Sequence, residues 1–497
     1  MLPRLIQGGM GVGVSSWTLA REVASHGQLG VVSGTALDTI LIRRLSLGDP
    51  GGHIRRALAA FPLPTIASTI LERYFKPRAH ASEAPPDHNA DASLEGQRFP
   101  LSPLPCVTLS ADQEWLLIVA NFVEVYLARH DNTSAGGAVG INYLHKIQFP
   151  TLPSLYSAML AGVDVVIMGA GIPGDIPGAL DLLSNHQEAR ITIDVQDAGD
   201  AKFESTFNPA ARWSEVSESA PPTLHRPKFL AVVSSVVLAK ALLKKVPGGI
   251  DGFVVEAPTA GGHNAPPRGT LQLSVRGEPI YGPRDNVDLA QMRDLGVPFW
   301  LAGGYATRER FREALAAGAH GVQIGTAFAF CEESGLDPAL RQRFLDSLLA
   351  GEASIFTDPS ASPTNYPFKV AALSGTLSDA ETYANRPRLC DLGYLRQAFK
   401  KADGSLGYRC PGEPIKDFLR KGGTADETAG RKCLCNSLLA NVGLGQRRKP
   451  GSRDEQGYTE PALLTAGDDL ACIAPFVSHQ RPTYHARDVI ETLLSAN

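Results

Sequence analysis

The chain has 497 residues, which is too long for one ordinary domain and suits one large domain with an extension. Lysine and arginine number 47 against 51 aspartates and glutamates, and the net charge of −4 lacks the basic surplus of nucleic-acid-binding proteins. Seven cysteines, an odd number, favour a reducing compartment over a disulfide framework.

No leader or membrane segment is apparent. Met1 is followed almost directly by the first apolar run, without the basic and apolar regions of a signal peptide. The most apolar helical stretch, residues 115–128, contains Asn121 and Glu124 and is too short to cross a bilayer. We therefore expect a cytoplasmic protein with neither a membrane nor a nucleic acid as partner, and the oligomeric state, including a homo-oligomer, stays open.

Short apolar or β-branched runs recur along the chain, each followed by a glycine-rich turn and then a helical pattern. This alternation is typical of parallel α/β folds, and eight strands are what a closed parallel barrel needs. The predicted strands are centred on residues 5–6, 29–32, 139–142, 163–168, 229–233, 253–256, 299–302 and 321–324. The sequence thus predicts an α/β protein, a (β/α)8 TIM barrel with a C-terminal α-rich extension.

The predicted barrel domain covers residues 1–345 and contains insertions near 61–137 and 171–226. In the first insertion, residues 78–105 are rich in Pro, Ala, Asp and Glu and predict a surface loop. Residues 111–130 place Trp115, Ile118 and Phe122 on one face and predict a helix. Residues 346–497 are expected to form a lid and a cysteine-containing extension.

Four glycine-rich turns directly follow predicted strands, where the active sites of such barrels lie. They are Gln7-Gly8-Gly9-Met10-Gly11, Gly261-Gly262-His263, Ala302-Gly303-Gly304 and Gly325-Thr326. The loops after strands seven and eight often build a phosphate site from backbone N–H groups and a helix N-terminus. The last two turns therefore predict a phosphate site, against the alternative that their glycines serve only tight turns.

The four motifs, in this order, resemble the nitronate monooxygenase (2-nitropropane dioxygenase) family over residues 3–330. Flavin-dependent enoyl-acyl carrier protein reductases share the motifs and the fold. The resemblance implies FMN as cofactor, with its ring against Gly9 and Met10 and its phosphate at the last two turns, and it places His263 toward the substrate. The cofactor-binding residues expected are Gly9, Met10, Gly11, Asn142, Glu256, Gly261, Gly262, Gly303, Gly304, Gly325 and Thr326.

His263 is the candidate catalytic residue. An imidazole with its ordinary pKa of ~6.5 is suited to accept a carbon-bound proton near neutral pH. The alternative is a histidine that only hydrogen-bonds a nearby loop. Glu256 and Asn142 end predicted strands and are expected to contact the flavin, although a structural role fits both nearly as well.

Two features of the predicted extension stand apart from the glycine-rich motifs. Residues 362–369 resemble a lid over the barrel mouth, with Lys369 as a contact for an anion or substrate. The second feature is a group of four cysteines within 46 residues: Cys390, Cys410, Cys433 and Cys435. Four thiolates suit zinc or an iron–sulfur cluster, but the spacing matches no standard metal pattern, so we expect free thiols and no metal.

The leading functional hypothesis is an FMN-dependent oxidoreductase that oxidises small nitronates or nitroalkanes with O2. The first alternative is a flavin-dependent enoyl-thioester reductase that uses NAD(P)H. The second is a non-catalytic flavin-binding barrel whose extension binds a partner. The sequence leaves the physiological substrate and the electron donor or acceptor open.

Overall fold

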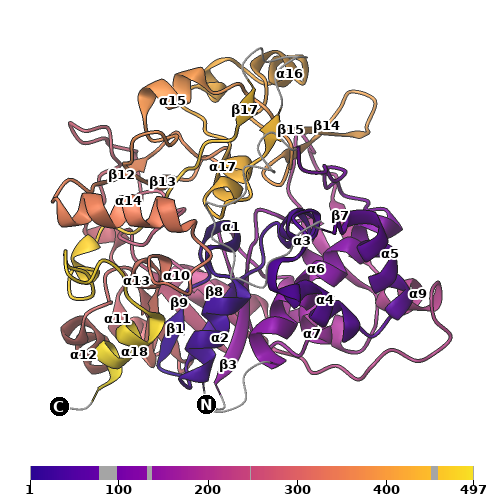
Figure 1. The fold of residues 1–497 in the computed structure, drawn as a ribbon, viewed down its shortest axis with the longest axis horizontal. Helices are drawn as coiled ribbons and strands as arrows, with labels where there is room; N and C mark the ends of the chain where they lie inside the picture. The colour runs from indigo at the N-terminus through magenta and orange to yellow at the C-terminus, as the bar shows by residue number, and fades with distance from the viewer. Residues whose placement is uncertain (1, 78–97, 131–136, 247, 449–456, 496–497) are drawn as a thin grey trace.

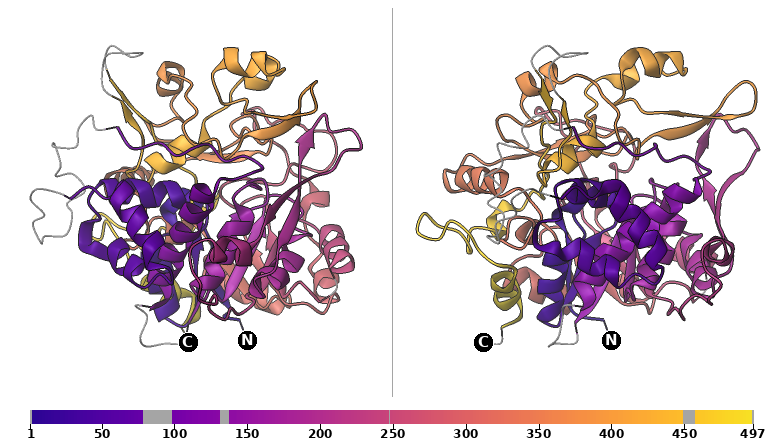
Figure 2. Two further views of the ribbon diagram at one scale, coloured as in Figure 1. Left: turned by 90° about the vertical axis from the view of Figure 1, so that its right-hand side faces the viewer. Right: turned by 45° about the vertical axis from the view of Figure 1, so that its right-hand side comes forward.

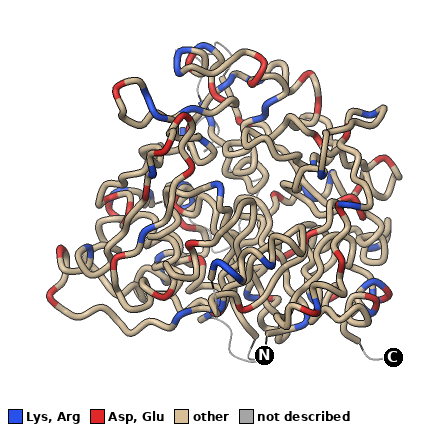
Figure 3. Tube along the Cα trace, turned by 180° about the vertical axis from the view of Figure 1, so that it is seen from behind, with Lys and Arg blue, Asp and Glu red and all other residues tan. Residues whose placement is uncertain are grey.

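The structure is a computed structural model, and it describes residues 2–77, 98–130, 137–246, 248–448 and 457–495. The loop predicted over residues 78–105 lies mostly outside these ranges. None of the helices in the described ranges combines the length and the apolar character that a membrane crossing requires. Figure 3 shows basic and acidic residues interspersed along the chain, as the small net charge suggests.

A closed barrel of eight parallel strands forms the centre of the molecule and confirms the predicted (β/α)8 fold (Figure 1). The strands follow one another around the barrel in chain order, and the last pairs with the first, Leu5 opposite Val322. They are β1 (Leu5–Gln7), β2 (Leu29–Ser33), β3 (Ala138–Leu144), β4 (Val165–Gly169), β8 (Lys228–Val233), β9 (Gly252–Glu256), β10 (Phe299–Ala302) and β11 (Gly321–Ile324). Every predicted strand is therefore present, within two residues of its expected bounds.

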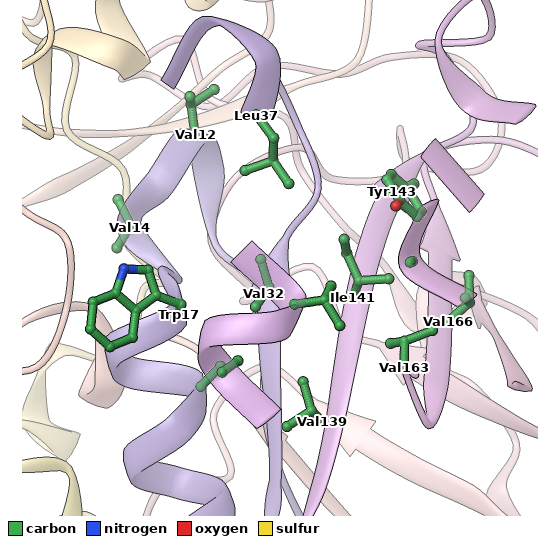
Figure 4. Packing of buried hydrophobic residues seen from close by; sticks show 14 of the residues in the cluster. Val12, Val14, Trp17, Val32, Leu37, Val139, Ile141, Tyr143, Val163 and Val166 are labelled. Carbon is green, nitrogen blue, oxygen red and sulfur yellow. The ribbon is translucent and has the colours of Figure 1, made fainter. Parts of the chain in front are cut away.

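The barrel strands bury both of their faces. Side chains alternate along each strand, so that Val31 belongs to an apolar cluster inside the barrel while Val32 packs in the layer under the helices. Figure 4 shows this outer layer, where Val32 and Ile141 lie near Leu37 and Trp17. Because both faces are apolar, chemistry is confined to the strand ends and the loops that follow them.

Helices surround the barrel, as Figures 1 and 2 show. They include α2 (Trp17–Ser25), α3 (Leu37–Ser46), α7 (Thr151–Leu160), α8 (Ile176–Ser184), α10 (Val236–Lys245), α11 (Leu289–Arg293), α12 (Arg308–Ala316) and α14 (Pro338–Leu349). The first insertion adds α4 (His53–Ala59), α5 (Pro64–Tyr74) and α6 (Ala111–His130). Helix α6 confirms the predicted helix, and it is buried on most sides because α2, α3, α4 and α7 all pack against it.

The second insertion contains α9 (Pro209–Ser214) and the antiparallel pair β5 (Ala189–Ile193) and β7 (Phe203–Phe207). In the sequence between these two strands lies β6 (Val195–Gln196), which is not part of the barrel. It pairs with β14 (Gln397–Lys400), which belongs to the extension and also pairs with β15 (Leu406–Arg409). The insertion is thereby tied to the C-terminal part of the chain.

The C-terminal part covers one end of the barrel, while both termini lie toward the other end (Figures 1 and 2). Its described helices are α15 (Ala380–Asn385), α16 (Ile415–Arg420), α17 (Leu434–Ala440) and α18 (Ala486–Leu494). Short strand pairs accompany them, namely β12 (Ile355–Asp358) with β13 (Phe368–Ala371) and β16 (Arg447–Arg448) with β17 (Tyr458–Thr459). The expected start of the extension at residue 346 falls inside α14, and α18 returns to pack on α2 and α12.

Candidate active site

A cavity of about 550 Å³ lies among the loops that follow the barrel strands. Its wall includes every barrel residue proposed from the sequence: Gly9, Met10, Gly11, Asn142, Glu256, Gly261, Gly262, His263, Gly303, Gly304, Gly325 and Thr326. The extension contributes the remaining side through Tyr366, Phe368 and residues 464–467. The structure therefore brings all four glycine-rich turns to one place.

The loop after β1 is anchored by Gln7, the last residue of that strand, whose side chain is fully buried. Its Nε2 donates to Ser15 Oγ at 2.8 Å, and its Oε1 accepts from the backbone N of Val31 at 2.9 Å. Ser15 Oγ also accepts from the backbone N of Met10 at 2.9 Å. These bonds hold the backbone of residues 8–10 against the cavity.

Gly9 lies directly against the side chain of Asn142, so any larger residue at position 9 would displace that side chain. A Cβ on Gly9 would lie 1.9 Å from Asn142 Oδ1. That oxygen is buried, and among the described residues it has no hydrogen-bond partner. Buried polar atoms are normally paired, so Asn142 Oδ1 points to a donor that a bound ligand supplies.

The turn after β10 has the backbone conformation expected of a phosphate loop. Gly303 and Gly304 have φ values of 95° and 81°, in the left-handed region that favours glycine. A Cβ on Gly303 would also lie 2.8 Å from Thr259 Oγ1. Helix α12 begins shortly after this turn with Thr307 as its N-cap, and a helix N-terminus favours a bound anion.

The neighbouring turn, after β11, is shared between the barrel and the extension. Thr326 opens the short helix α13 (Thr326–Ala329), and its Oγ1 accepts from the backbone N of Gly467 at 2.9 Å. The hydroxyl keeps its own proton for donation. The predicted contact of Thr326 with a phosphate thus has to be made beside an extension loop that the sequence did not indicate.

His263 projects from the loop after β9 and is held by the extension. Its Nε2 lies 2.7 Å from Ser362 Oγ, and its ring makes an edge contact with Phe368 at a centroid distance of 4.9 Å. Ser362 is the ring's hydrogen-bond partner within the described part of the chain. Burial lowers the pKa of His263 to about 4, so the ring is neutral at pH 7 and a weaker base than the sequence suggested.

Glu256, the last residue of β9, faces the same cavity. Burial raises the pKa of its carboxyl group to about 7. No described residue forms a hydrogen bond or an ion pair with this side chain. The cavity therefore holds two groups that change charge in different pH ranges, Glu256 near neutrality and His263 in acid.

Lys369 occupies a different place from the one proposed. Its side chain is only 2% exposed and does not border the cavity. Lys369 Nζ donates to Asp468 Oδ2 at 2.6 Å and to Thr357 Oγ1 at 2.7 Å. A buried ammonium needs such partners, so the structure assigns Lys369 to an ion pair inside the extension and not to an anion or substrate contact.

Residues 464–468, the strap, run along the loop after β9. Thr465 Oγ1 accepts from the backbone N of Gly262 at 3.0 Å, and the backbone N of Asp468 donates to Thr259 O at 3.0 Å. A Cβ on Gly261 would lie 2.9 Å from the backbone carbon of Ala466. The sequence analysis did not predict the strap. The local pattern there, Gly467 followed by Asp468 and Asp469, indicates no more than a turn.

The residues of the cavity fit a flavin mononucleotide. Two turns of bare backbone lie together at adjacent strand ends, where a phosphate binds in such barrels. The unpaired Asn142 oxygen suits an N–H donor, and the mainly apolar loops beside it suit a planar ring system. FMN has each of these parts.

One family of known proteins matches part of the barrel in sequence. The sequence model of the nitronate monooxygenase family matches residues 215–357. This segment contains Glu256, His263 and the glycine turns after β10 and β11.

Curated relatives match over part of their length. The chain is 37% identical over 99 residues to a probable nitronate monooxygenase of Bacillus subtilis (strain 168), which is 20% of this chain and 27% of that protein. It is 30% identical over 120 residues to a (3aS,4S,5R,7aS)-5-hydroxy-7a-methyl-1-oxo-octahydro-1H-indene-4-carboxyl-CoA dehydrogenase of Mycobacterium tuberculosis, 24% of this chain and 30% of that protein. The matches thus span about three tenths of these relatives.

Among solved structures, a nitroalkane oxidase from Streptomyces ansochromogenes aligns with 99% of this chain and 94% of its own, at 15% identity and a TM-score of 0.42. The likeness to a family depends on the sequence matches alone. Over residues 215–357 the chain is similar to the nitronate monooxygenase family, and several of the curated relatives that it matches in part carry that name.

Proposed function

We propose that the protein is a cytoplasmic, FMN-dependent oxidoreductase that oxidises small nitronates or nitroalkanes with O2. The observation that carries the proposal is the convergence of Gly303, Asn142 and His263 on one cavity at the carboxyl ends of the barrel strands. The family match and the name of the Bacillus relative support the same chemistry.

The barrel loops would hold the cofactor. The phosphate would bind to the turns at Gly303-Gly304 and Gly325-Thr326, and the ring would lie against Gly9, Met10 and Gly11, between Asn142 and the loop of Gly261 and Gly262. When bound, FMN supplies the capacity to accept the substrate's electrons and to pass them to O2. The protein supplies position and a path for the proton. We assign residues 346–497 the role of a lid that completes this site.

His263 is the proposed acceptor of the α-proton of a neutral nitroalkane. Thr364 donates its backbone N–H to Ser362 Oγ at 3.2 Å, and the Thr364 Oγ1 lies 2.8 Å from the same oxygen. Ser362 Oγ can therefore accept a hydrogen bond from His263 Nε2 and donate one to Thr364 Oγ1, which leaves His263 Nδ1 to accept the substrate proton. The imidazolium formed is stabilised by the nitronate anion produced beside it.

Glu256 would control the binding of anionic substrates. Its raised pKa of about 7 means that the carboxyl group is mainly neutral below pH 7 and charged above it. A carboxylate and a nitronate in one cavity repel each other. The affinity for nitronate should therefore fall as the pH rises through 7.

The decisive experiment is purification followed by a visible spectrum and an anaerobic titration with a nitronate. We expect yellow protein that releases FMN, not FAD, on denaturation, and a flavin that is reduced by substrate and reoxidised by air with release of nitrite. Colourless protein that FMN cannot reconstitute would exclude the proposal.

A second candidate function is the reduction or oxidation of a coenzyme A or acyl carrier thioester. The observation in its favour is the Mycobacterium tuberculosis relative, whose name specifies a carboxyl-CoA substrate. If the thioester is reduced, NAD(P)H would reduce the flavin, and if the thioester is oxidised, the thioester itself would reduce it; nitronate would do so in neither case. A flavin that no candidate substrate reduces would instead favour a non-catalytic flavin-binding barrel.

A further inference from the structure

The wall of the barrel cavity contains a carboxyl group that lacks an electrostatic partner. Glu256 borders the cavity at the end of β9, and burial raises its pKa to about 7. No cation of the described residues offsets this effect. A carboxylate that leaves water is costly unless it is paired, so we expect the partner of Glu256 to arrive with a bound molecule.

The basic side chains that border the cavity do not serve this carboxyl group. Arg268 is exposed, and its Nη2 donates to Ser234 O at 2.8 Å. His263 is neutral at pH 7, because burial lowers its pKa to about 4. Within the part of the chain that the structure describes, the negative charge that Glu256 acquires above neutral pH therefore stays uncompensated.

A second polar atom on the wall lacks a hydrogen-bond donor. Asn264 is 1% exposed and borders the cavity. Its Nδ2 donates to Ala260 O at 2.9 Å, which fixes the orientation of the amide and leaves Oδ1 as an acceptor. Among the described residues, Asn264 Oδ1 is buried without a hydrogen-bond partner. Since buried polar atoms are normally paired, this oxygen independently indicates a donor on a ligand.

Glu256 and Asn264 belong to the same region of the wall. The Tyr281 hydroxyl donates to Ala265 O at 3.0 Å, directly beside Asn264 in the chain. Burial is the first cause that raises the pKa of Tyr281 to about 12, and nearby carboxylates, Glu256 among them, add to it. Because such an effect weakens with distance, Glu256 lies within electrostatic range of the loop that carries Asn264.

The two groups together select the kind of ligand. A nitro group offers only acceptor oxygens, and the N–H of a flavin ring, which suits Asn142, carries no positive charge. A hydroxyl or an amide would satisfy Asn264 Oδ1 but would leave a carboxylate at Glu256 uncompensated. A primary ammonium group has three donors and a positive charge, so it satisfies both groups at once.

We propose that Glu256 and Asn264 form a subsite for a primary ammonium group, and that the substrate is a small nitroalkane or nitronate with an amino substituent. The ammonium would also offset the repulsion between the Glu256 carboxylate and a nitronate in the same cavity. The identity of the reacting group rests on the proposed function, whereas the ammonium subsite requires only the cavity.

The test compares two substrates of equal shape at pH 8, where the Glu256 carboxyl group is mainly ionised. Nitropropylamine has its nitro and ammonium groups at opposite ends of the chain, and nitrobutane has a methyl group in place of the ammonium. For wild-type holoenzyme we expect a kcat/KM at least about tenfold higher with nitropropylamine, the factor typical of a hydrogen bond to a charged group. Equal values for the two substrates would overturn the proposal.

Variants locate the preference within the cavity. Glu256→Gln keeps the shape of the side chain and removes its charge, so the preference should disappear. The matched control is Asp469→Asn, because Asp469 also borders the cavity but precedes η5 (Leu470–Cys472), which packs on α13. This control should keep the preference, and an equal loss in both variants would reduce the effect to the overall charge of the cavity. Asn264→Ala should lower the preference roughly 2–10-fold, and no change would remove Asn264 from the subsite.

A binding measurement separates the subsite from the reaction. Calorimetry on the protein as purified gives the dissociation constants of butylammonium and of butanol, and we expect butylammonium to bind at least about tenfold tighter in wild type but not in Glu256→Gln. If it does so while no nitro compound reduces the flavin, the proposed function fails and the subsite stands. Oxidation of nitrobutane together with equal binding of butanol and butylammonium would preserve the proposed function and overturn the subsite. Should Glu256→Gln fail to fold, the two wild-type comparisons still decide.

Discussion

The barrel and the C-terminal extension build the two sides of the same cavity in different ways. The barrel contributes bare backbone at strand ends, as at Gly9 and Gly303, where a regular fold places the turns together. The extension contributes side chains and a strap that hold these turns, through Ser362 and Thr465. The barrel side therefore depends on a local chain pattern, whereas the orientation of the His263 side chain depends on a contact with a segment distant in the sequence.

The two regions also differ in what holds them together. The interior of the barrel is apolar, with Val31 and Val254 among its buried side chains. The extension instead contains buried ion pairs, such as Arg386 with Glu460, whose Nε to Oε1 distance is 2.7 Å and whose side chains are 4% and 0% exposed. Burying paired charges costs desolvation energy, so the extension depends on complete pairing more than the barrel does.

The largest effect is expected on the affinity for FMN, when Gly303 of the barrel is replaced by aspartate. A carboxylate would face the phosphate, and its Cβ would lie 2.8 Å from Thr259 Oγ1. Gly303→Asp should weaken FMN binding by at least about 100-fold, ~3 kcal/mol, as measured from bound flavin absorbance. The control is Gly296→Asp, at a positive φ of 71° with open space around the added Cβ. Equal loss of flavin in both variants would remove the phosphate assignment.

Replacing His263 by asparagine should spare the cofactor and slow the chemistry. We expect His263→Asn to keep the flavin spectrum and to lose ~10²–10⁴-fold in the anaerobic rate of flavin reduction by a neutral nitroalkane. The loss with pre-formed nitronate should be smaller, because that substrate has already given up its α-proton. Equal losses on both substrates would reduce His263 to a positioning residue. His225→Asn, at an exposed position, serves as the control.

Replacing Lys369, which pairs with Asp468, tests whether the extension supports the loops proposed to bind the cofactor. Lys369→Met removes the partner of Asp468 while keeping an apolar stem of similar length, so the strap loses its anchor. Removing one partner leaves the Asp468 carboxylate unpaired, but this side chain is 42% exposed and can be solvated, so the free energy of unfolding should fall by about 1–3 kcal/mol. FMN should dissociate ~10-fold faster, as followed by stopped-flow fluorescence. Lys432→Met, which breaks the 3.2 Å pair with Asp358 outside the cavity, should leave the release rate unchanged.

The pH dependence of nitronate binding isolates Glu256. Because its pKa is raised to about 7, wild-type protein should show a KM for nitronate that increases about tenfold from pH 6 to pH 8 as the carboxyl group ionises. The Glu256→Gln variant stays neutral and should show a flat profile over this range. Steady-state kinetics at fixed ionic strength measure both. A pH dependence that persists in the variant would assign the titration to another group.

The smallest effect is expected from Ser362→Ala, which removes one neutral hydrogen bond from His263. A bond of this kind is worth ~1 kcal/mol, so the reduction rate with neutral nitroalkane should fall roughly 2–10-fold. The rate with nitronate should stay nearly constant, since the tautomer of His263 matters only for the proton transfer. Ser360→Ala, in the same loop but without contact to His263, controls for loop stability. A similar loss on both substrates would show only loosened packing.

Local patterns explain how much of this protein was predictable. The barrel strands and helix α6 follow from apolar periodicity within a few residues, and the glycine turns follow from the same short windows. The cavity residues from Gly9 to Thr326 were predictable because a closed barrel brings the carboxyl ends of all strands to one end. The role of Lys369 was not predictable, since its partner Asp468 lies 99 residues along the chain.

The sequence by itself determined the barrel, its strand order and the glycine turns at the strand ends, because each of these depends on neighbours within one β/α unit. Only the tertiary structure decided the tether of His263 to Ser362, the strap and the meeting of four cysteines at one cavity. It also decided the opposite pKa shifts of His263 and Glu256. The physical reason is that burial and long-range contacts, which set charge state and side-chain aim, exist only once distant segments have packed together.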